Sequence, residues 1–459
     1  MKADRVTKAH DVVVVGAGDV GAAVAFKAAA TGRAVALIDK GSVGGTCVNN
    51  GCVPSKTLIH AADRICEIRE AERLGIRADL SAPDFGGAMD RARAMVANGR
   101  QSLQRAIEET GEITFHPHQA RFVTSHTLEA GAERISGKTI FIATGSRPAL
   151  PAIPGLADVP FLTNESVLEL DTKPPSLIML GGGYVGLEYA HFFSAFGTSV
   201  VVVERGERLL PSEEPEVSSL LERRLAERLR LILGAAVIEV KQHGAGCTAV
   251  VKLRDGTLEQ VRGERLFVAA GRSSNADLLE VEKAGVALDE RGYIRVDDRL
   301  RTNRRGVYAL GDATGKAMFT HAGDKEAEIA WRNASGGPRA AMDFAAVPHA
   351  VFTWPQIASV GLTEVQARAG QEVLIGVARY DATVMGRAMA ESDGFAKAIV
   401  AKATRRILGF HIVGPHASLL IAEVANAVQA KARVEDISGC MHVFPALSDL
   451  VTEAFSNLA

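Results

Sequence analysis

The fold is decided by one stretch of sequence, 11-DVVVVGAGDVGAAVAFKAAATGRAVALID-39. A β-branched run over residues 11–15 leads directly into a glycine-rich turn. An alanine-rich stretch then ends near Gly32, and a second apolar run ends at Asp39. Short apolar runs are typical of buried parallel strands, and the alanine-rich stretch is typical of a helix. The order of strand, glycine turn, helix, strand and acid predicts a βαβ unit that binds a dinucleotide.

The same arrangement recurs further along the chain, at 176-SLIMLGGGYVGLEYAHFFSAFGTSVVVVE-204. In both copies the glycines allow a pyrophosphate to approach the helix N-terminus, and the final acid can accept hydrogen bonds from a ribose. Two copies predict two Rossmann-like dinucleotide-binding domains in an α/β chain. The residues that we expect to bind the two dinucleotides are Gly16, Gly18, Gly21, Asp39, Gly181, Gly183, Gly186 and Glu204.

The C-terminal part has a different order of predicted elements, in which alternating strands are followed by helices. This order predicts a third, α+β domain. We expect its strands at residues 351–353, 395–400 and 409–413, a helix at 419–432 and a last helix from about Leu447. The expected domains are residues 1–150, completed by 270–340, then residues 151–269, and then residues 345–459.

Composition narrows the class of protein. The chain has 459 residues, 47% of them hydrophobic and 23% charged, with a net charge of −2. Such a balance is typical of a globular chain and gives no positive field for nucleic acid or anionic lipid, so we expect neither as a partner. The N-terminus lacks the apolar core of a signal peptide, and no stretch is apolar enough to span a membrane. We therefore expect a cytoplasmic enzyme.

Two cysteines follow the first nucleotide unit directly, in 44-GGTCVNNGCVPSK-56. Cys47 and Cys52 are close enough in sequence to reach disulfide geometry where the second one opens a helix. A thiolate at a helix N-terminus is stabilised by the local dipole, which predicts a reactive sulfur at Cys52. A metal site would need two more ligands, whereas Cys66, Cys247 and Cys440 are single and scattered, so we expect no metal site.

The second nucleotide unit gives an ambiguous signal about its cofactor. The negative charge of Glu204 disfavours a 2′-phosphate by repulsion and favours NADH. Arg205 and Arg208 follow immediately and could hold that phosphate instead. We expect NADH, with NADPH as the alternative.

Several motifs together resemble those of the flavoprotein disulfide reductases, the family of glutathione reductase, dihydrolipoamide dehydrogenase and mercuric reductase. They are the cysteine segment above, GAGDVG, GGGYVGLE, ATGSRP at 143–148, ALGD at 309–312 and VFTWPQIASVGLTE at 351–364. The resemblance covers nearly the whole chain. It implies an FAD-binding domain first, an NAD(P)-binding domain second and a C-terminal dimerisation domain, in a homodimer whose active site borrows C-terminal residues from the partner.

The resemblance also implies roles for single residues. Cys47 resembles the thiol that meets the substrate, and Cys52 the thiol stacked against the flavin. Lys56 resembles the lysine beside the flavin, with Glu188 as its ion-pair partner, and Tyr184 resembles the ring that covers the nicotinamide side until the cofactor enters. The remaining cofactor-binding residues that we expect are Lys40, Gly45, Thr46, Thr144, Gly145, Ser146, Gly271, Gly311 and Asp312, with Arg205 in the second unit.

The C-terminus departs from the dithiol-processing members, which carry a His-Pro pair followed by a glutamate. In 441-MHVFPALSD-449, alignment on the proline places Phe444 at the position of the catalytic base and Asp449 at that of its orienting acid. Phenylalanine cannot transfer protons. His442 lies two residues upstream and points the same way as Phe444 on an extended segment, so we keep it as a catalytic candidate.

The function expected first is therefore a mercuric-reductase-like reduction of a metal ion or another thiol-reactive acceptor, because a metal ion needs thiolates but no protonating histidine. The tyrosine that follows the Phe-Pro pair in that branch is replaced by Ala446, and Cys440 is a possible stand-in ligand. Dihydrolipoamide-dehydrogenase-type oxidoreduction is the alternative to this function. A non-catalytic flavin redox sensor or complex subunit is the second alternative.

Overall fold

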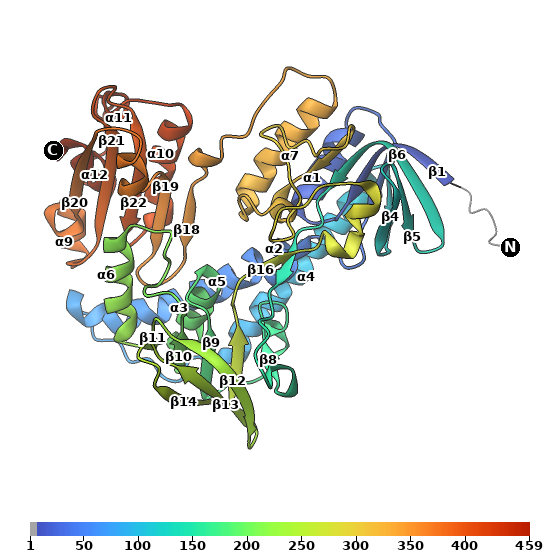
Figure 1. Ribbon diagram of the computed structural model, residues 1–459. Coiled ribbons are helices and arrows are strands. Elements are labelled where there is room, and N and C mark those ends of the chain that lie inside the picture. Colours follow the sequence, from blue (N-terminus) through green and yellow to red (C-terminus); the bar gives the residue numbers. More distant parts are fainter. Residues whose placement is uncertain (1–6) are drawn as a thin grey trace. The chain divides into compact units, whose positions relative to one another are not determined.

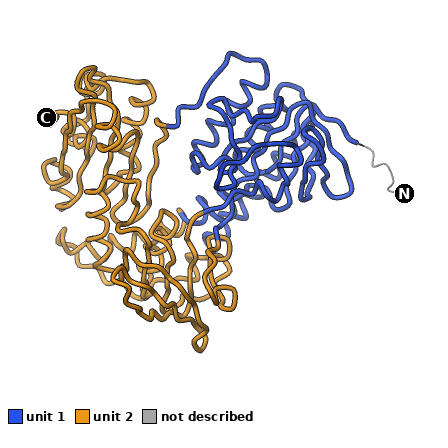
Figure 2. Tube along the Cα trace, in the orientation of Figure 1, with its two compact units in different colours: residues 1–55, 90–149, 272–344 blue, residues 56–89, 150–271, 345–459 orange. Residues whose placement is uncertain are grey.

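The computed structural model describes residues 7–459, so the part of the N-terminal prediction that concerns residues 1–6 lies outside it. Its internal contacts divide the chain into two compact units, shown in different colours in Figure 2. The first unit consists of residues 1–55, 90–149 and 272–344, and the second of residues 56–89, 150–271 and 345–459. Each unit is assembled from three separate stretches of the chain.

The first unit is built on a largely parallel sheet (Figure 1). Its central strand, β1 (Thr7–Val15), pairs in parallel with β2 (Val35–Ile38) on one side and β6 (Glu133–Ile142) on the other. β3 (Ile113–His116) extends the sheet beyond β2, and β17 (Val307–Ala309) pairs in parallel with β6. The antiparallel strands β4 (Ala120–Thr124) and β5 (Thr127–Ala130) continue the sheet next to β6.

Helices carry the connections of this sheet. α1 (Asp19–Ala29) joins β1 to β2 and packs against α7 (Thr320–Ala334). The cysteine segment forms the short helix α2 (Gly45–Asn50) and the start of α3 (Cys52–Glu70), and α4 (Phe85–Glu109) precedes β3. The strands β7 (Ser146–Pro148) and β16 (Arg272–Ser274) form a separate antiparallel pair.

The second unit contains the other βαβ motif. β9 (Ser176–Leu180) pairs in parallel with β10 (Ser199–Val203), and α5 (Tyr184–Ala195) joins them. The remaining strands of this sheet are β11 (Arg230–Ile232), β15 (Arg265–Val268) and β8 (Phe161–Leu162). A three-stranded antiparallel sheet follows α6 (Pro215–Ala226) in the chain and consists of β12 (Ala236–His243), β13 (Gly246–Lys252) and β14 (Leu258–Gly263).

The C-terminal part of the second unit is an antiparallel sheet with helices packed on it. Its strands, in spatial order, are β18 (His349–Val351), β19 (Ile357–Gly361), β22 (Ile407–Val413), β21 (Phe395–Ala401) and β20 (Val373–Arg379). The helices are α8 (Glu364–Arg368), α9 (Val384–Ala388), α10 (Ala417–Gln429), α11 (Val434–Ser438) and α12 (Asp449–Ser456). α10 packs on β19 and β22, and α12 packs on β20 and β21.

The two glycine turns adopt the same backbone conformation. Gly16 and Gly181 both have a φ of +109°, a region that favours glycine. A Cβ atom on Gly16 would lie 2.1 Å from the carbonyl oxygen of Ala143, and one on Gly181 would lie 2.4 Å from that of Ala269. In both copies the turn therefore needs glycine because the backbone passes directly against the end of a neighbouring strand.

The predicted α/β fold with two dinucleotide-binding motifs and a C-terminal α+β domain is confirmed. The division into three domains with the expected bounds stays a prediction. One element differs: the strand expected at 351–353 is β18 (His349–Val351), because the chain turns after Val351, where the Thr353 hydroxyl donates to the carbonyl of Pro355 at 2.6 Å. Across residues 7–459, no helix combines the length and apolar character needed to cross a membrane.

Candidate active site

The acid that ends β2 holds the first glycine turn. One oxygen of the Asp39 carboxylate accepts from the backbone N–H of Ala17 at 2.6 Å, and the other accepts from that of Gly41 at 2.9 Å. Asp39 also lines a pocket together with Gly16 and Thr144. The Thr144 hydroxyl is buried, and among the described residues it has no hydrogen-bond partner. The turn, the acid and an unsatisfied polar group therefore face one cavity.

The second glycine turn has the same pattern of hydrogen bonds between an acid and backbone amides. The Glu204 carboxylate accepts from the backbone N–H of Gly182 at 2.6 Å and from that of Gly206 at 2.7 Å. A Cβ atom on Gly183 would meet no atom within 4 Å, so this side of the turn is open. Arg205 is exposed. The negative charge predicted at the end of β10 is thus fixed in place by two backbone amides.

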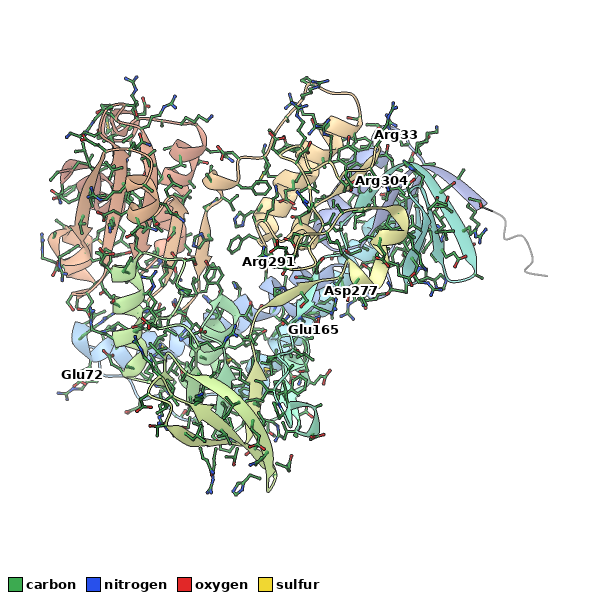
Figure 3. The ribbon with its side chains drawn as sticks, in the orientation of Figure 1. Arg33, Glu72, Glu165, Asp277, Arg291 and Arg304 are labelled. Carbon is green, nitrogen blue, oxygen red and sulfur yellow. The ribbon has the colours of Figure 1, made fainter. Side chains whose placement is uncertain are left out.

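The segments around Ser146 and Asp312, far apart in sequence, meet in the first unit. The Ser146 hydroxyl donates to the Asp312 carboxylate at 2.6 Å, and Arg272 Nε donates to the Ser146 hydroxyl at 2.5 Å. Arg147 pairs with Asp277, which is labelled in Figure 3, at 2.7 Å. These polar contacts reinforce the pairing of β7 with β16, and they bring two predicted cofactor-binding residues together.

The two cysteines of the predicted redox pair lie against each other. Cys47 is in α2, and Cys52 is the first residue of α3. A hydrogen bond to Cys52, burial and a hydrogen bond to Asp19 together raise the pKa of the Cys47 thiol, and Thr320 opposes them. The Cys52 sulfur lies 3.4 Å from the Thr320 hydroxyl, at the first turn of α7. Three helix N-terminal regions, those of α1, α3 and α7, therefore supply the groups around the sulfurs.

Lys56 and Glu188 form the ion pair that the resemblance implies. Lys56 Nζ lies 2.6 Å from Glu188 Oε2, and the backbone N–H of Phe352 donates to the other carboxylate oxygen at 3.2 Å. The Lys56 ammonium also lies 4.8 Å from the centroid of the Phe352 ring. The Glu188 side chain is only 8% exposed, whereas that of Lys56 is 37% exposed. The carboxylate is therefore a buried anchor for a lysine that still reaches solvent.

The C-terminal loop presents apolar side chains to solvent. Phe444 is 73% exposed, and its neighbours Met441 and Val443 are exposed as well. His442 is turned away from that surface, with Nε2 2.7 Å from a carboxylate oxygen of Glu423 on α10 and Nδ1 3.1 Å from the Cys440 carbonyl. The hydrogen bond to Glu423 raises the pKa of His442.

Three other predicted site residues have backbone contacts near the groups described above. Gly45 lies against the first glycine turn, where a Cβ atom would come within 2.7 Å of the Gly18 Cα. The carbonyl of Gly145 accepts from the backbone N–H of Asn275 at 3.1 Å, and the backbone N–H of Gly311 donates to Glu326 at 2.5 Å. The expected residues of the first unit are Gly16, Gly18, Gly21, Asp39, Lys40, Gly45, Thr46, Cys47, Cys52, Thr144, Gly145, Ser146, Gly311 and Asp312. Those of the second unit are Lys56, Gly181, Gly183, Tyr184, Gly186, Glu188, Glu204, Arg205, Gly271 and His442.

Sequence reasoning missed several groups that touch these residues. Asp19 and Thr320 flank the cysteines, Arg272 bonds to Ser146, and Phe352 contacts both Lys56 and Glu188. Asp19 lies inside the glycine motif and Arg272 directly follows an expected glycine, so position alone could have suggested these two. Phe352 lies in the motif at 351–364, which could have suggested it, whereas Thr320 carries no local signal because only the tertiary packing brings it to the site.

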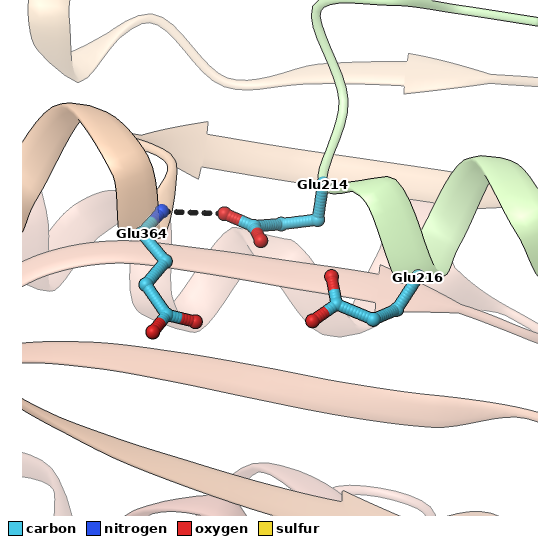
Figure 4. A group of neighbouring side chains, drawn as sticks. All are labelled: Glu214, Glu216 and Glu364. Carbon is cyan, nitrogen blue, oxygen red and sulfur yellow. Dashed lines mark hydrogen bonds between the residues drawn. The ribbon is translucent and has the colours of Figure 1, made fainter. Parts of the chain in front are cut away.

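One acidic cluster invites a metal-binding interpretation. The carboxylates of Glu214, Glu216 and Glu364 converge, as Figure 4 shows. The ammonium of Lys397 lies 2.7, 3.1 and 2.7 Å from Glu214, Glu216 and Glu364 respectively, and its side chain is 4% exposed. The positive charge among these carboxylates is thus a buried lysine, and the cluster is a structural ion network.

Comparison with known proteins places these features in a family. Residues 10–327 match the pyridine nucleotide-disulphide oxidoreductase family, and residues 347–455 match its dimerisation domain. The chain is 36% identical to dihydrolipoyl dehydrogenase 3 of Haloarcula marismortui over 98% of this chain and 97% of that protein. It is 33% identical to a mercuric reductase of Staphylococcus aureus over 94% of this chain and 79% of that protein.

A solved structure is similar over almost the full length. The Cu(II) complex of the HOCl-induced flavoprotein disulfide reductase RclA from Escherichia coli aligns with a TM-score of 0.88 and 30% identity, covering 98% of this chain and 99% of that chain. Together these matches identify an enzyme that uses FAD and NAD(P)H, and the dimerisation domain indicates a homodimer. The chain belongs to the pyridine nucleotide-disulphide oxidoreductase family, as a flavoprotein disulfide oxidoreductase.

Proposed function

We propose that this enzyme uses electrons from NAD(P)H to reduce a soft metal ion or another thiol-reactive acceptor, with Cys47 and Cys52 as its redox pair. The contact between the two sulfurs supports this role, since thiols this close can form and break a disulfide. The position of Cys52 at the start of α3 favours its thiolate. We propose Cys47 as the sulfur that meets the acceptor, as in the family that it resembles.

The electrons balance over one cycle. Two electrons from one NAD(P)H open the Cys47–Cys52 disulfide and leave two sulfur atoms as thiols or thiolates. A two-electron acceptor such as Hg(II) then binds to the thiolates and takes both electrons, and the disulfide forms again. A one-electron acceptor such as Cu(II) would need two ions for each NAD(P)H. Neither acceptor requires a proton from the protein.

The first unit fits FAD. The pocket between Gly16 and Asp39 contains the unpartnered Thr144 hydroxyl, a group that a nucleotide could satisfy. We propose that this turn and Asp39 hold the adenosine end, and that Ser146 and Asp312 hold the middle of the dinucleotide. FAD, when bound, passes electron pairs between NAD(P)H and the cysteines. We propose that the other predicted cofactor-binding residues of the first unit contact FAD as well.

The second unit supports NADH as the electron donor. The Glu204 carboxylate, fixed by two backbone amides, places a negative charge at the end of β10, where a 2′-phosphate would be repelled. We propose that the enzyme prefers NADH to NADPH. Lys56, held by Glu188, would place a positive charge that favours negative charge on the bound cofactor. A cytoplasmic location stays a prediction.

The choice of acceptor rests mainly on the phenylalanine at position 444. The position at which dithiol-processing relatives have a histidine base is occupied by a phenylalanine whose side chain is 73% exposed. A hydrocarbon ring can neither accept nor donate the proton that disulfide interchange requires. Reduction of a thiolate-bound metal ion has no such requirement. The mercuric reductase relative and the similarity to RclA, which was solved as a Cu(II) complex, support the same class of acceptor.

The His442–Glu423 pair favours a second candidate, dihydrolipoamide-type oxidoreduction. A histidine hydrogen-bonded to a carboxylate is the arrangement of a general acid–base pair, and it lies two residues before Phe444. The dihydrolipoyl dehydrogenase relative supports this candidate too. We rank it second because both ring nitrogens of His442 already have protein partners.

Parallel turnover assays test the proposal. Purified holoenzyme is supplied with NADH and, in separate assays, with Hg(II) in excess thiol, with Cu(II) in the absence of added thiol, and with glutathione disulfide. The reverse direction is assayed with dihydrolipoamide and NAD⁺. We expect metal-dependent NADH oxidation that is lost in Cys47→Ser and retained in Cys440→Ser, and at most slow dithiol turnover. Fast lipoamide turnover without metal-dependent oxidation would favour the second candidate.

A further inference from the structure

We propose that Glu213 and His349 are positioning residues that hold the Tyr184 side chain and thereby set how tightly the enzyme binds its nicotinamide dinucleotide. All three residues belong to the second unit. Neither Glu213 nor His349 lies in a motif that marks it in the sequence, and the proposed mechanism uses neither. Because Tyr184 acts in the NAD(P)H half of the reaction, its positioning is independent of the identity of the electron acceptor.

Tyr184 is the first residue of α5, directly after the second glycine turn. Its hydroxyl donates to Glu213 Oε1 at 3.2 Å. Its ring is stacked on that of His349, with centroids 5.7 Å apart and an angle of 25° between the planes. One carboxylate and one aromatic ring therefore fix the tyrosine at its two ends.

The Glu213 carboxylate is itself held rigidly. The residue is 1% exposed, and its Oε1 lies 2.6 Å from His349 Nε2. Its Oε2 accepts from the Ser359 hydroxyl at 2.7 Å, and Ser359 in turn lies 3.0 Å from His411 Nδ1. Although burial by itself raises the pKa of Glu213, His349 and Ser359 outweigh it and hold that pKa below its ordinary value. An ionised, immobile carboxylate is a strong acceptor for the tyrosine hydroxyl.

The network joins two parts of the chain that carry different tasks. Glu213 lies in the loop between β10 and α6, directly after the nucleotide-binding motif, whereas His349 and Ser359 lie on β18 and β19 of the C-terminal sheet. One turn along α5 from Tyr184, Glu188 holds Lys56. The tyrosine therefore stands between the glycine turn and the active-site ion pair.

The resemblance to the flavoprotein disulfide reductases implies that this ring moves when the dinucleotide enters. Any such movement of Tyr184 breaks a charge-assisted hydrogen bond to Glu213 and a ring contact with His349. The free energy of this conformational change contributes to the free energy of binding, because the dinucleotide binds only the state in which the ring has moved. The strength of the two contacts should thus appear in the affinity for the dinucleotide.

The experiment compares Tyr184→Phe, Glu213→Gln and the double variant. Tyr184→Phe keeps the ring and its stacking and removes only the hydroxyl. We expect each single variant to change the dissociation constant of NAD⁺ or NADP⁺, whichever the wild-type holoenzyme binds, by about fivefold in the same direction. The double variant should change the constant by less than the product of the two single effects, because both substitutions act on the hydrogen bond between Tyr184 and Glu213. Isothermal titration calorimetry measures the constants, and KM should follow while kcat changes less.

Glu227→Gln is the matched control. It changes the same side chain at the end of α6, where Glu227 is 61% exposed and pairs with Arg224 at 3.9 Å. We expect wild-type affinity in this variant. Unchanged dissociation constants in Tyr184→Phe would overturn the inference, even if Glu213→Gln proved too unstable to purify. Opposite shifts in the two single variants, or fully additive effects in the double variant, would overturn it as well.

Discussion

Lys56 and Glu188 are separated by 132 positions in sequence, yet their charged atoms lie 2.6 Å apart. Lys56 is on the helix that begins with Cys52, and Glu188 is on the helix that follows the second glycine turn. The pair therefore links the cysteine-bearing helix to the nucleotide-binding motif, and the contact of Asp63 with His191 at 2.9 Å joins the same two helices. Because the carboxylate is buried and the lysine is partly exposed, the carboxylate fixes the position of the cation.

Glu188→Gln should slow the reduction of the enzyme by NADH. The amide can still accept a hydrogen bond from Phe352, but it no longer attracts the Lys56 ammonium. We expect a loss of about tenfold, the effect of about 1.4 kcal/mol on a barrier. Stopped-flow absorbance of the flavin measures the rate. Glu227→Gln serves as the control, and an unchanged rate in Glu188→Gln would mean that the pair has no part in the reaction.

Phe444→His should give the enzyme disulfide reductase activity. The substitution restores an imidazole at the position where dithiol-processing relatives carry their base, and general acid–base catalysis contributes 10²- to 10⁴-fold, so we expect a gain of about tenfold or more. Turnover of glutathione disulfide and of dihydrolipoamide measures it. Val443→His is the matched control, because Val443 is equally exposed on the same loop. Equal activity in both variants would show that the position has no special role.

Glu423→Gln should lower the pKa of His442. The carboxylate raises that pKa above its ordinary value of 6.5 by stabilising the imidazolium, and the amide removes this charge. The raised pKa contributes stability that is complete below the ordinary pKa and is lost as the pH rises through the folded-state value. NMR titration of ¹³C-labelled histidines, assigned with His442→Gln, measures the pKa. An unshifted titration would show that the two side chains do not interact in solution.

Glu326 should make the protein less stable as the pH rises. The side chain is fully buried, one oxygen accepts from Gly311, and the other has no partner among the described residues. Burial raises its pKa to about 7, so the folded protein binds a proton that the unfolded chain releases above the ordinary value of 4.5. The cost grows from that value to about pH 7 and reaches on the order of 3 kcal/mol.

Glu326→Gln tests this prediction, because the amide is neutral at every pH. The difference in melting temperature between wild-type holoenzyme and Glu326→Gln should move in favour of the variant from about pH 5 to about pH 7.5. Glu328→Gln is the control on the same helix, since Glu328 is about half exposed and pairs with Lys325. Parallel pH profiles for wild type and Glu326→Gln would contradict the raised pKa.

The parts of the molecule that could be predicted from the sequence are those that short segments specify. The turn at Gly16 requires glycine, and the acid of the same unit, Asp39, closes that turn within one βαβ motif. Cys47 and Cys52 are likewise local, since five positions and a helix start bring their sulfurs together. The pairing of Lys56 with Glu188 is not local, and it was reached only through resemblance to a known family.

The remaining features depend on tertiary packing. Tyr184 and Glu213 are hydrogen-bonded although a strand and a loop separate them in the chain. His349 contacts both of them from another part of the chain. Tyr184 lies in the second glycine motif, but no periodicity or motif marks Glu213 or His349. The shift of the expected strand at 351–353 to β18 has a similar origin, because a side-chain hydrogen bond at Thr353 turns the backbone where the apolar pattern continues.

A count of free thiols before and after reduction by NADH tests directly whether Cys47 and Cys52 are a redox pair. Oxidised holoenzyme is treated anaerobically with excess NADH, denatured in alkylating reagent, and analysed by mass spectrometry. In the wild type we expect Cys47 and Cys52 to become alkylated only after NADH is added, whereas the other three cysteines react equally in both samples. If Cys47 and Cys52 are alkylated to the same extent with and without NADH, they do not exchange electrons with the cofactors, and the two cysteines are not a redox pair.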